Sequence, residues 1–255
     1  MRFVRFIKQG STESKFGWIY EDMVGEIEGN LFSEYRRLEA DTPIEKVKLL
    51  SPLIPGKIVA AGWNYIDHAR EFDRPIPEFP TIFLKPPSSV IGMGDGIILP
   101  EISRQVEHEC ELAIVIGKKA KMILPEDAYS YIFGYTAAND VTARDLQKKD
   151  ETWARAKGFD TFCPLGPWIE TDFEPADAML TCRVNSELRQ MASTRDMIFP
   201  IPSILAFISS IMTLNPGDII LTGTPAGTAP LEAGDVVEVQ IDGIGSLTNP
   251  VVKQM

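Results

Sequence analysis

The stretch EHECELAIVIGKKAKMILPEDAYSYIFGYTAAND, residues 107–140, decides the fold. It opens with acids at every second position, Glu107, Glu109 and Glu111, and continues into the apolar run 112–116. Successive side chains of a β-strand point to opposite faces of the sheet. The spacing therefore predicts a strand that carries all three carboxylates on one face.

A second apolar run, residues 132–138, leads to Asp140. If the two runs pair side by side, Asp140 joins Glu109 and Glu111 as a third carboxylate. Three oxygen ligands, with no nitrogen or sulfur ligand required, suit Mg²⁺, Mn²⁺ or Ca²⁺ rather than Zn²⁺. The alternative is that the alternating acids form the solvated face of a strand, and a short motif alone does not decide between the two.

The composition indicates a chain that can bury a large core, with 44% hydrophobic residues among 255. The net charge of −11 argues against nucleic acid and anionic membrane surfaces as partners. An anionic small molecule remains compatible, because a bound cation can reverse the local field. Three scattered cysteines do not make a disulfide framework or a zinc site, so a reducing, cytoplasmic location is expected. The apolar runs are far shorter than the ~20 residues of a membrane span.

The segment SPLIPG at 51–56 interrupts the chain with two prolines and a glycine. It predicts a small N-terminal β-rich domain at 1–55 and a main domain at 56–255. Alternation at residues 2–7 predicts an edge strand, and residues 32–38 fit a short helix.

The two histidines are expected to differ in role. His68 and Glu71 stand three residues apart, so one helical turn places them on a shared face. A histidine oriented by a carboxylate is a candidate general base for water. The alternative is a charged surface turn, which the residue types alone favour. His108 should face away from the carboxylates, and the proline-rich segment 73–80 predicts a mobile loop where a lid would lie.

Further polar groups follow the predicted strands. Arg144 and Gln147 share one face of a predicted helix and point either to the site or to solvent. Lys85 is either a site cation or a loop lysine. The loop TGTPAG at 222–227 follows a buried strand and offers N–H groups and hydroxyls to an anion such as a substrate carboxylate, or is a structural turn.

Two elements of the second half are predicted by pattern. Residues 180–199 fit a β-hairpin, with strands at 180–184 and 188–191 and a turn at Asn185 and Ser186. Residues 203–213 carry an apolar stripe at helical spacing and predict a helix.

Several segments together resemble the fumarylacetoacetate hydrolase family, in that family's order along the chain. The resemblance implies a mixed, β-rich α+β fold with a β-roll or barrel core, a homodimer, and a site for Mg²⁺ or Mn²⁺. The matching segments are GWNYIDHARE (62–71), FLKPPSS (83–89), EHECELAIVIGKKA (107–120), GYTAANDVTARDLQ (134–147), KGFDTFCPLGPW (157–168), VNSELRQ (184–190) and LTGTPAGT (221–228).

The resemblance also implies roles for nine residues, and it leaves Glu107 as an ordinary surface residue. Trp63 is a departure, because many relatives carry arginine there. The implied residues are Glu109, Glu111 and Asp140 as metal ligands, His68, Glu71 and Lys157 in catalysis, and Arg144, Gln147 and Thr224 in substrate binding.

Within the family, the acylpyruvase and 2-hydroxyhepta-2,4-diene-1,7-dioate isomerase branch is the one the chain resembles. This implies a metal-dependent enzyme that acts on a 2-oxo acid through a metal-stabilised enolate. Intact His68 and Glu71 favour C–C hydrolysis of an acylpyruvate or fumarylpyruvate. The alternatives are the isomerase and 5-oxopent-3-ene-1,2,5-tricarboxylate decarboxylase of aromatic catabolism, an oxaloacetate decarboxylase or tautomerase, and a non-catalytic metal-binding protein of the same fold.

Overall fold

The computed structural model describes residues 1–254, and its largest feature is a twelve-stranded sheet. The main path of this sheet runs β4-β3-β2-β1-β14-β12-β11-β17-β6-β7, with β5 beside β1 and β8 beside β14. The path is open at both ends, so the sheet does not close on itself. Its strands are β1 (Arg2–Lys8), β2 (Ser14–Tyr20), β3 (Met23–Gly29), β4 (Tyr35–Pro43), β5 (Val47–Leu49), β6 (Ile58–Gly62), β7 (Thr81–Lys85), β8 (Val90–Ile91), β11 (Cys110–Ile116), β12 (Ile132–Asn139), β14 (Cys163–Glu170) and β17 (Ile219–Leu221).

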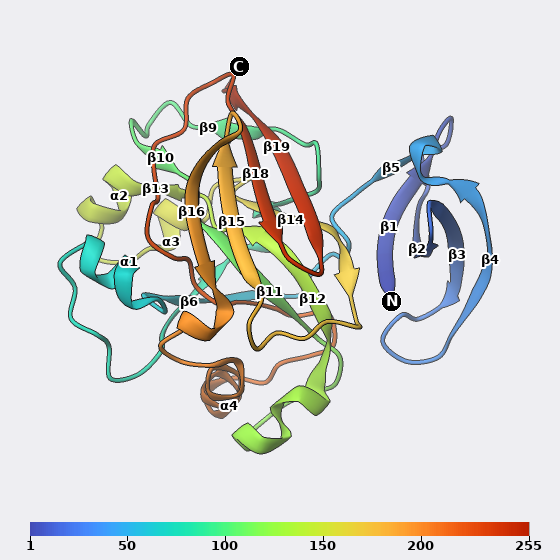
Figure 1. Cartoon of the computed structure of the whole chain (residues 1–255), viewed down its shortest axis with the longest axis horizontal. Helices are drawn as coiled ribbons and strands as arrows, with labels where there is room; N and C mark the ends of the chain where they lie inside the picture. Colours follow the sequence, from blue (N-terminus) through green and yellow to red (C-terminus); the bar gives the residue numbers. More distant parts are fainter. Residues whose placement is uncertain (255) are drawn as a thin grey trace.

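A second sheet of five strands has the order β16-β15-β18-β19-β9, and β10 pairs with β13. The five-stranded sheet packs across β11 and β12, in front of them in Figure 1, and the main apolar core lies between the two layers. The predicted β-rich α+β class is thus confirmed. These strands are β9 (Ile97–Leu99), β10 (Val106–Glu107), β13 (Thr142–Ala143), β15 (Met179–Val184), β16 (Glu187–Ser193), β18 (Val236–Ile241) and β19 (Gly245–Lys253).

Helices are short and lie at the edges of the sheets. The predicted helix near 203–213 and the predicted hairpin within 180–199 are confirmed as α4 and as β15 with β16. No helix within residues 1–254 combines the length and the apolar character that crossing a membrane requires. The helices are α1 (Ile66–Glu71), α2 (Arg144–Lys149), α3 (Ala154–Lys157) and α4 (Ile201–Ile211), with 3₁₀ turns η1 (Ile44–Lys46), η2 (Pro87–Ser89), η3 (Pro125–Tyr131) and η4 (Thr194–Asp196).

Strands β1–β5 form a separate lobe, drawn in blue at the right of Figure 1. The edge-strand prediction for residues 2–7 is wrong, because β1 lies inside the sheet with β2 and β5 beside it and β14 beyond. The helix prediction for 32–38 is also wrong, because β4 begins at Tyr35. The hydrogen-bond ladder with β3 continues along β4 to Pro43, and such pairing overrides local propensity.

The two runs that open the sequence analysis pair as predicted. Strands β11 and β12 are antiparallel, with Cys110 opposite Asn139, and the Asp140 amide donates to the Glu109 carbonyl at 2.8 Å. Every residue of β11 is buried because the sheet is covered on both faces. This register brings the ends of the two strands together and places their acids at one point.

Candidate active site

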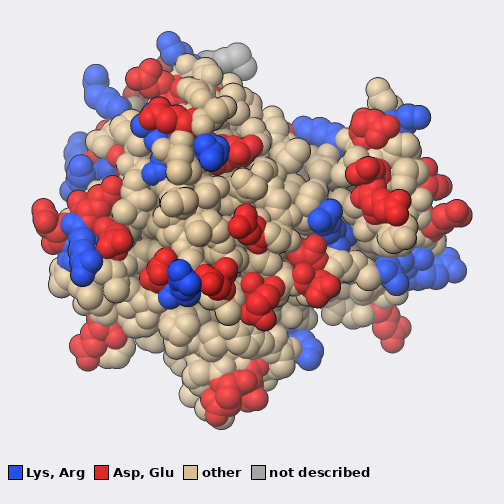
Figure 2. Space-filling view, in the orientation of Figure 1, with Lys and Arg blue, Asp and Glu red and all other residues tan. Residues whose placement is uncertain are grey.

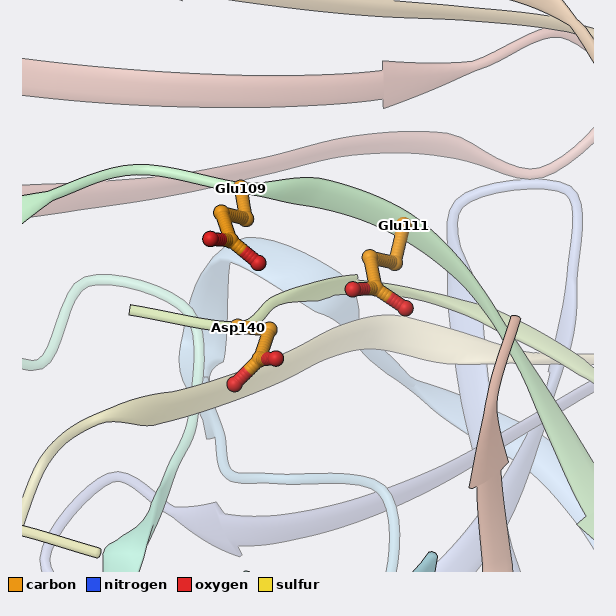
Figure 3. A group of neighbouring side chains, drawn as sticks. All are labelled: Glu109, Glu111 and Asp140. Carbon is orange, nitrogen blue, oxygen red and sulfur yellow. The ribbon is translucent and has the colours of Figure 1, made fainter. Parts of the chain in front are cut away.

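Three carboxylates meet where β11 begins and β12 ends. Oxygens of Glu109, Glu111 and Asp140 all lie within 4.8 Å of one another, and all three side chains are buried. Figure 3 shows Glu109, just before β11, and Glu111, on β11, extending toward Asp140, so that the three groups face a shared point. The period-two spacing of the strand produces this arrangement.

The carboxylate cluster is electrostatically unbalanced. Burial raises the pKa of Glu111 well above its usual range, and the charges of Asp140 and Glu109 raise it further. Burial also raises the pKa of Glu109, but Lys157 and Arg144 outweigh that effect and leave this pKa below the usual range. The Glu111 carboxylate accepts from the Gly223 amide at 2.6 Å and makes no ion pair within residues 1–254. A buried group of oxygen ligands with an unpaired acid fits a hard divalent cation.

Two buried lysines contact the same carboxylates. Lys157 Nζ lies 2.7 Å from Glu109 Oε2 and 2.6 Å from Asp140 Oδ2. Lys85 Nζ lies 2.6 Å from Asp140 Oδ1 and donates to the Lys157 carbonyl at 2.6 Å. Lys85 is therefore a cation of the site and not a loop lysine. Its sequence position, at the end of an edge strand, gave no sign that the side chain is buried.

Arg144 is a third buried cation in contact with the cluster. Its Nη2 lies 2.5 Å from Glu109 Oε1, and its Nη1 donates to Gln147 at 2.7 Å. Its Nε lies 2.7 Å from Glu107 Oε2. Glu107 is only 4% exposed, so its assignment as an ordinary surface residue is wrong. The physical reason is that Glu107 pairs with the buried guanidinium of Arg144, whose other carboxylate partner, Glu109, also pairs with Lys157.

His68 and Glu71 lie on α1 at the mouth of the site. His68 Nδ1 is 3.2 Å from Glu71 Oε2, and the Gly227 amide donates to Glu71 Oε1 at 3.1 Å. Burial raises the pKa of Glu71, but the bonds from His68 and Gly227 outweigh it and lower the pKa overall. The indole of Trp63 stacks on the His68 ring at 5.1 Å, with 25° between the planes. The carboxylate and the indole together fix the orientation of the imidazole.

Residues far apart in the sequence line one pocket around these groups. Glu71 does not line it and reaches it through His68. Phe83, on β7, and Trp153, just before α3, also line the pocket. Their sequence positions gave no sign of this, because a single aromatic residue in a strand or a loop reads as an ordinary packing residue. The lining residues are Ala61, Gly62, Trp63, His68, Phe83, Glu109, Glu111, Asp140, Arg144, Gln147, Trp153, Lys157 and Thr224.

Comparison with known proteins finds relatives over the whole chain. Residues 57–252 match the family model described as fumarylacetoacetate (FAA) hydrolase C-terminal, and residues 1–52 match Rv2993c-like, N-terminal. The chain is 46% identical to oxaloacetate tautomerase, mitochondrial, of Xenopus laevis, over 81% of this chain and 69% of that protein.

Two solved structures cover the whole chain as well. The 2-hydroxyhepta-2,4-diene-1,7-dioate isomerase of Mycobacterium marinum is 43% identical with a TM-score of 0.92, covering 100% of this chain and 99% of that one. Maleylpyruvate hydrolase of Sphingobium sp. SYK-6, in complex with manganese(II) and pyruvate, is 32% identical with a TM-score of 0.83 and covers 100% of both chains. With the match over 57–252, which contains every residue of the pocket, the chain belongs to the fumarylacetoacetate hydrolase family, a family of enzymes.

Proposed function

We propose that this protein is an enzyme that hydrolyses a C–C bond of an acylpyruvate-type 2-oxo acid with the help of Mg²⁺ or Mn²⁺. One observation carries the proposal: a histidine held by a carboxylate lies in the same pocket as three clustered acids and a buried lysine. Glu109, Glu111 and Asp140 would hold the cation. Once bound, that cation would polarise the 2-oxo acid and stabilise negative charge on its keto oxygen.

The proton chemistry falls to His68. The Glu71 carboxylate can only accept, so the proton of the imidazole lies on Nδ1 and Nε2 carries the free lone pair. Nε2 can take a proton from water while the oxygen attacks the distal carbonyl of the substrate. The bond between that carbonyl carbon and C3 then breaks, and its electron pair stays with the pyruvate half as an enolate. Protonation at C3 gives pyruvate and a carboxylic acid.

The remaining groups bind the acid. Lys157 adds positive charge beside the substrate oxygens, and Arg144 with Gln147 lines the opposite wall. Thr224 offers a hydroxyl to the substrate carboxylate. The carboxylates that would hold the metal ion lie near the ends of β11 and β12, whereas His68 lies on α1. The substrate would therefore bind between the ion and the base, in contact with both.

A second candidate function is tautomerisation of oxaloacetate. The Xenopus laevis relative bears that name, and a base in the pocket that can move a proton at C3 serves this reaction without water. Both candidates need the same bound 2-oxo acid. They differ in whether a C–C bond breaks.

Turnover of acetylpyruvate and oxaloacetate with Mg²⁺ tests the proposal. Ultraviolet absorbance follows the enol, and a coupled assay follows pyruvate. We expect acetylpyruvate to yield equal amounts of pyruvate and acetate. Loss of the oxaloacetate enol signal without pyruvate would favour the tautomerase instead, and pyruvate from oxaloacetate would indicate a decarboxylase. A protein that turns over neither acid contradicts the proposal.

The ion itself is tested by heat stability. Mg²⁺ at about one hundred times its Kd should stabilise the fold by about 2.7 kcal/mol, a rise in Tm of roughly 5–10 °C. Glu111→Gln should abolish this rise while leaving the metal-free Tm nearly unchanged, because the amide oxygen can still accept from Gly223. Differential scanning calorimetry with and without Mg²⁺ measures both values. A full Mg²⁺ shift in the variant would contradict the assignment of Glu111 as a ligand.

We also propose that the protein acts as a homodimer on a small-molecule substrate, with no nucleic-acid or membrane partner. On the face shown in Figure 2, acidic and basic side chains of the described residues are interspersed without a continuous basic surface. Sedimentation velocity would test the dimer.

A further inference from the structure

A buried amide, that of Gln190, connects three segments behind the pocket. Gln190 lies on β16 and is 1% exposed. Its Oε1 is 3.1 Å from the Cys110 amide nitrogen and 2.9 Å from His108 Nδ1. Its Nε2 is 2.7 Å from the Pro225 carbonyl and 2.8 Å from Thr224 Oγ1. The amide therefore uses both of its donors and both of its acceptor positions.

Two backbone groups fix which end of the Gln190 amide is which. The Cys110 N–H can only donate, so the atom that it contacts is the oxygen. The Pro225 carbonyl can only accept, so the atom that it contacts is the nitrogen. A flipped amide would set two donors against each other at one end and two acceptors at the other, and such buried mismatches are costly.

This polarity decides the direction of the Thr224 hydroxyl. The Nε2 of Gln190 carries only protons, so Thr224 Oγ1 must accept from it. A hydroxyl has one proton of its own, and within residues 1–254 it has no oxygen or nitrogen acceptor. Its neighbour there is the thiol of Cys110, whose sulfur accepts weakly. Thr224 also lines the pocket, so its proton is available to an anion bound there.

We propose that Gln190 is a positioning residue, which directs the Thr224 hydroxyl proton into the pocket and so strengthens binding of the substrate carboxylate. This inference rests on the proposed function, since it names the carboxylate of a 2-oxo acid as the acceptor. Gln190 itself does not line the pocket and acts only through Thr224.

Binding of oxalate, which resembles the enolate of pyruvate, tests the role directly. We expect Gln190→Met, a neutral change of similar size, to weaken oxalate binding in Mg²⁺ by about 10-fold, the loss of one hydrogen bond to a charged group. The Kd is measured by calorimetry or by fluorescence of Trp63 and Trp153, which line the pocket. In turnover, KM should rise while kcat stays nearly unchanged.

A double-mutant cycle separates positioning from a general loss of packing. If Gln190 acts through Thr224, then Gln190→Met should weaken oxalate binding no further in a Thr224→Val background. Equal losses in both backgrounds would overturn the inference, and so would unchanged affinity in the single variant.

Asn249→Leu is the matched control. Asn249 is also buried and donates two amide bonds, to the Gly92 and Asp95 carbonyls, away from the pocket. It should lower the Tm but leave oxalate affinity intact, and a loss of affinity as large as that of Gln190→Met would overturn the positioning role.

The results distinguish this inference from the proposed function. Oxalate binding that depends on Gln190 through Thr224, in a protein without turnover of either 2-oxo acid, would support the inference and contradict the proposed reaction. Normal turnover with no effect of Gln190→Met would contradict the inference alone. A wild-type protein that does not bind oxalate with Mg²⁺ would contradict both.

Discussion

Replacement of Lys157 by methionine is expected to destabilise the metal-free protein by about 3 kcal/mol, the lower end of the cost of breaking a buried ion pair. Lys157 neutralises both Glu109 and Asp140, and its removal leaves these buried acids short of one positive charge. The loss stays at the lower end because Arg144 still pairs with Glu109 and Lys85 with Asp140. Urea denaturation in the presence of a chelator measures the change.

The same variant should keep a Mg²⁺-dependent rise in Tm no smaller than that of wild type. A lysine beside the acids opposes a divalent ion, so its removal should leave the Mg²⁺-dependent rise in Tm at least as large, although turnover falls. Lys57→Met is the matched control, because Lys57 pairs with the buried Asp218 outside the pocket. That variant should lose stability and keep the wild-type Mg²⁺ shift. Metal-free Lys157→Met of wild-type stability would contradict the role of Lys157 in the cluster.

Replacement of His68 by alanine is expected to lower kcat for acetylpyruvate cleavage by about 10²–10⁴-fold, the usual contribution of a general base. In the proposed mechanism this ring accepts the proton of the attacking water, and its side-chain hydrogen-bond partner within residues 1–254 is Glu71, which does not line the pocket, so oxalate affinity should change little. Stopped-flow absorbance gives kcat, and calorimetry gives the Kd for oxalate.

Asp67→Asn provides the control on the same helix, since the side chain of Asp67 is 79% exposed and its one ion pair within residues 1–254 is with Arg70. It should keep wild-type kcat. Full cleavage activity in His68→Ala would exclude His68 as the base. If the protein also decarboxylates oxaloacetate and this activity survives in His68→Ala, decarboxylation needs no base at position 68.

The parts of the fold that sequence predicts are those with strong local periodicity. The apolar runs of β11 and β12, the β15–β16 hairpin and the stripe of α4 each repeat at the spacing of their element. The predicted helix at 32–38 failed because β3 supplies a ladder partner from outside that window. Local pattern cannot report a partner strand.

The candidate site shows the same division. Spacing placed Glu109 and Glu111 on one face of a strand together with Glu107, and Asp140 joined them only on the condition that the two apolar runs pair, which they do. The choice of Glu109, Glu111 and Asp140 as the ligands came from the family resemblance. Spacing could not tell that Glu107 is buried, since that depends on Arg144, which lies 37 residues away. Gln190 was missed as a site residue for the same reason, and for Lys85 the sequence left both a site cation and a loop lysine open. Each is defined by partners that only the folded chain brings near.

The proposed base and the proposed metal ligands lie on different kinds of secondary structure. The three carboxylates lie at or next to the ends of β11 and β12, which are interior strands of the large sheet. His68 and Glu71 instead lie on the six-residue helix α1, where the Gly227 amide donates to Glu71. Under the proposed function, we therefore expect substitutions around α1 to alter which bond reacts without disturbing how a 2-oxo acid is bound. Two relatives more than 40% identical to this chain bear the names of a tautomerase and an isomerase, which agrees with this expectation.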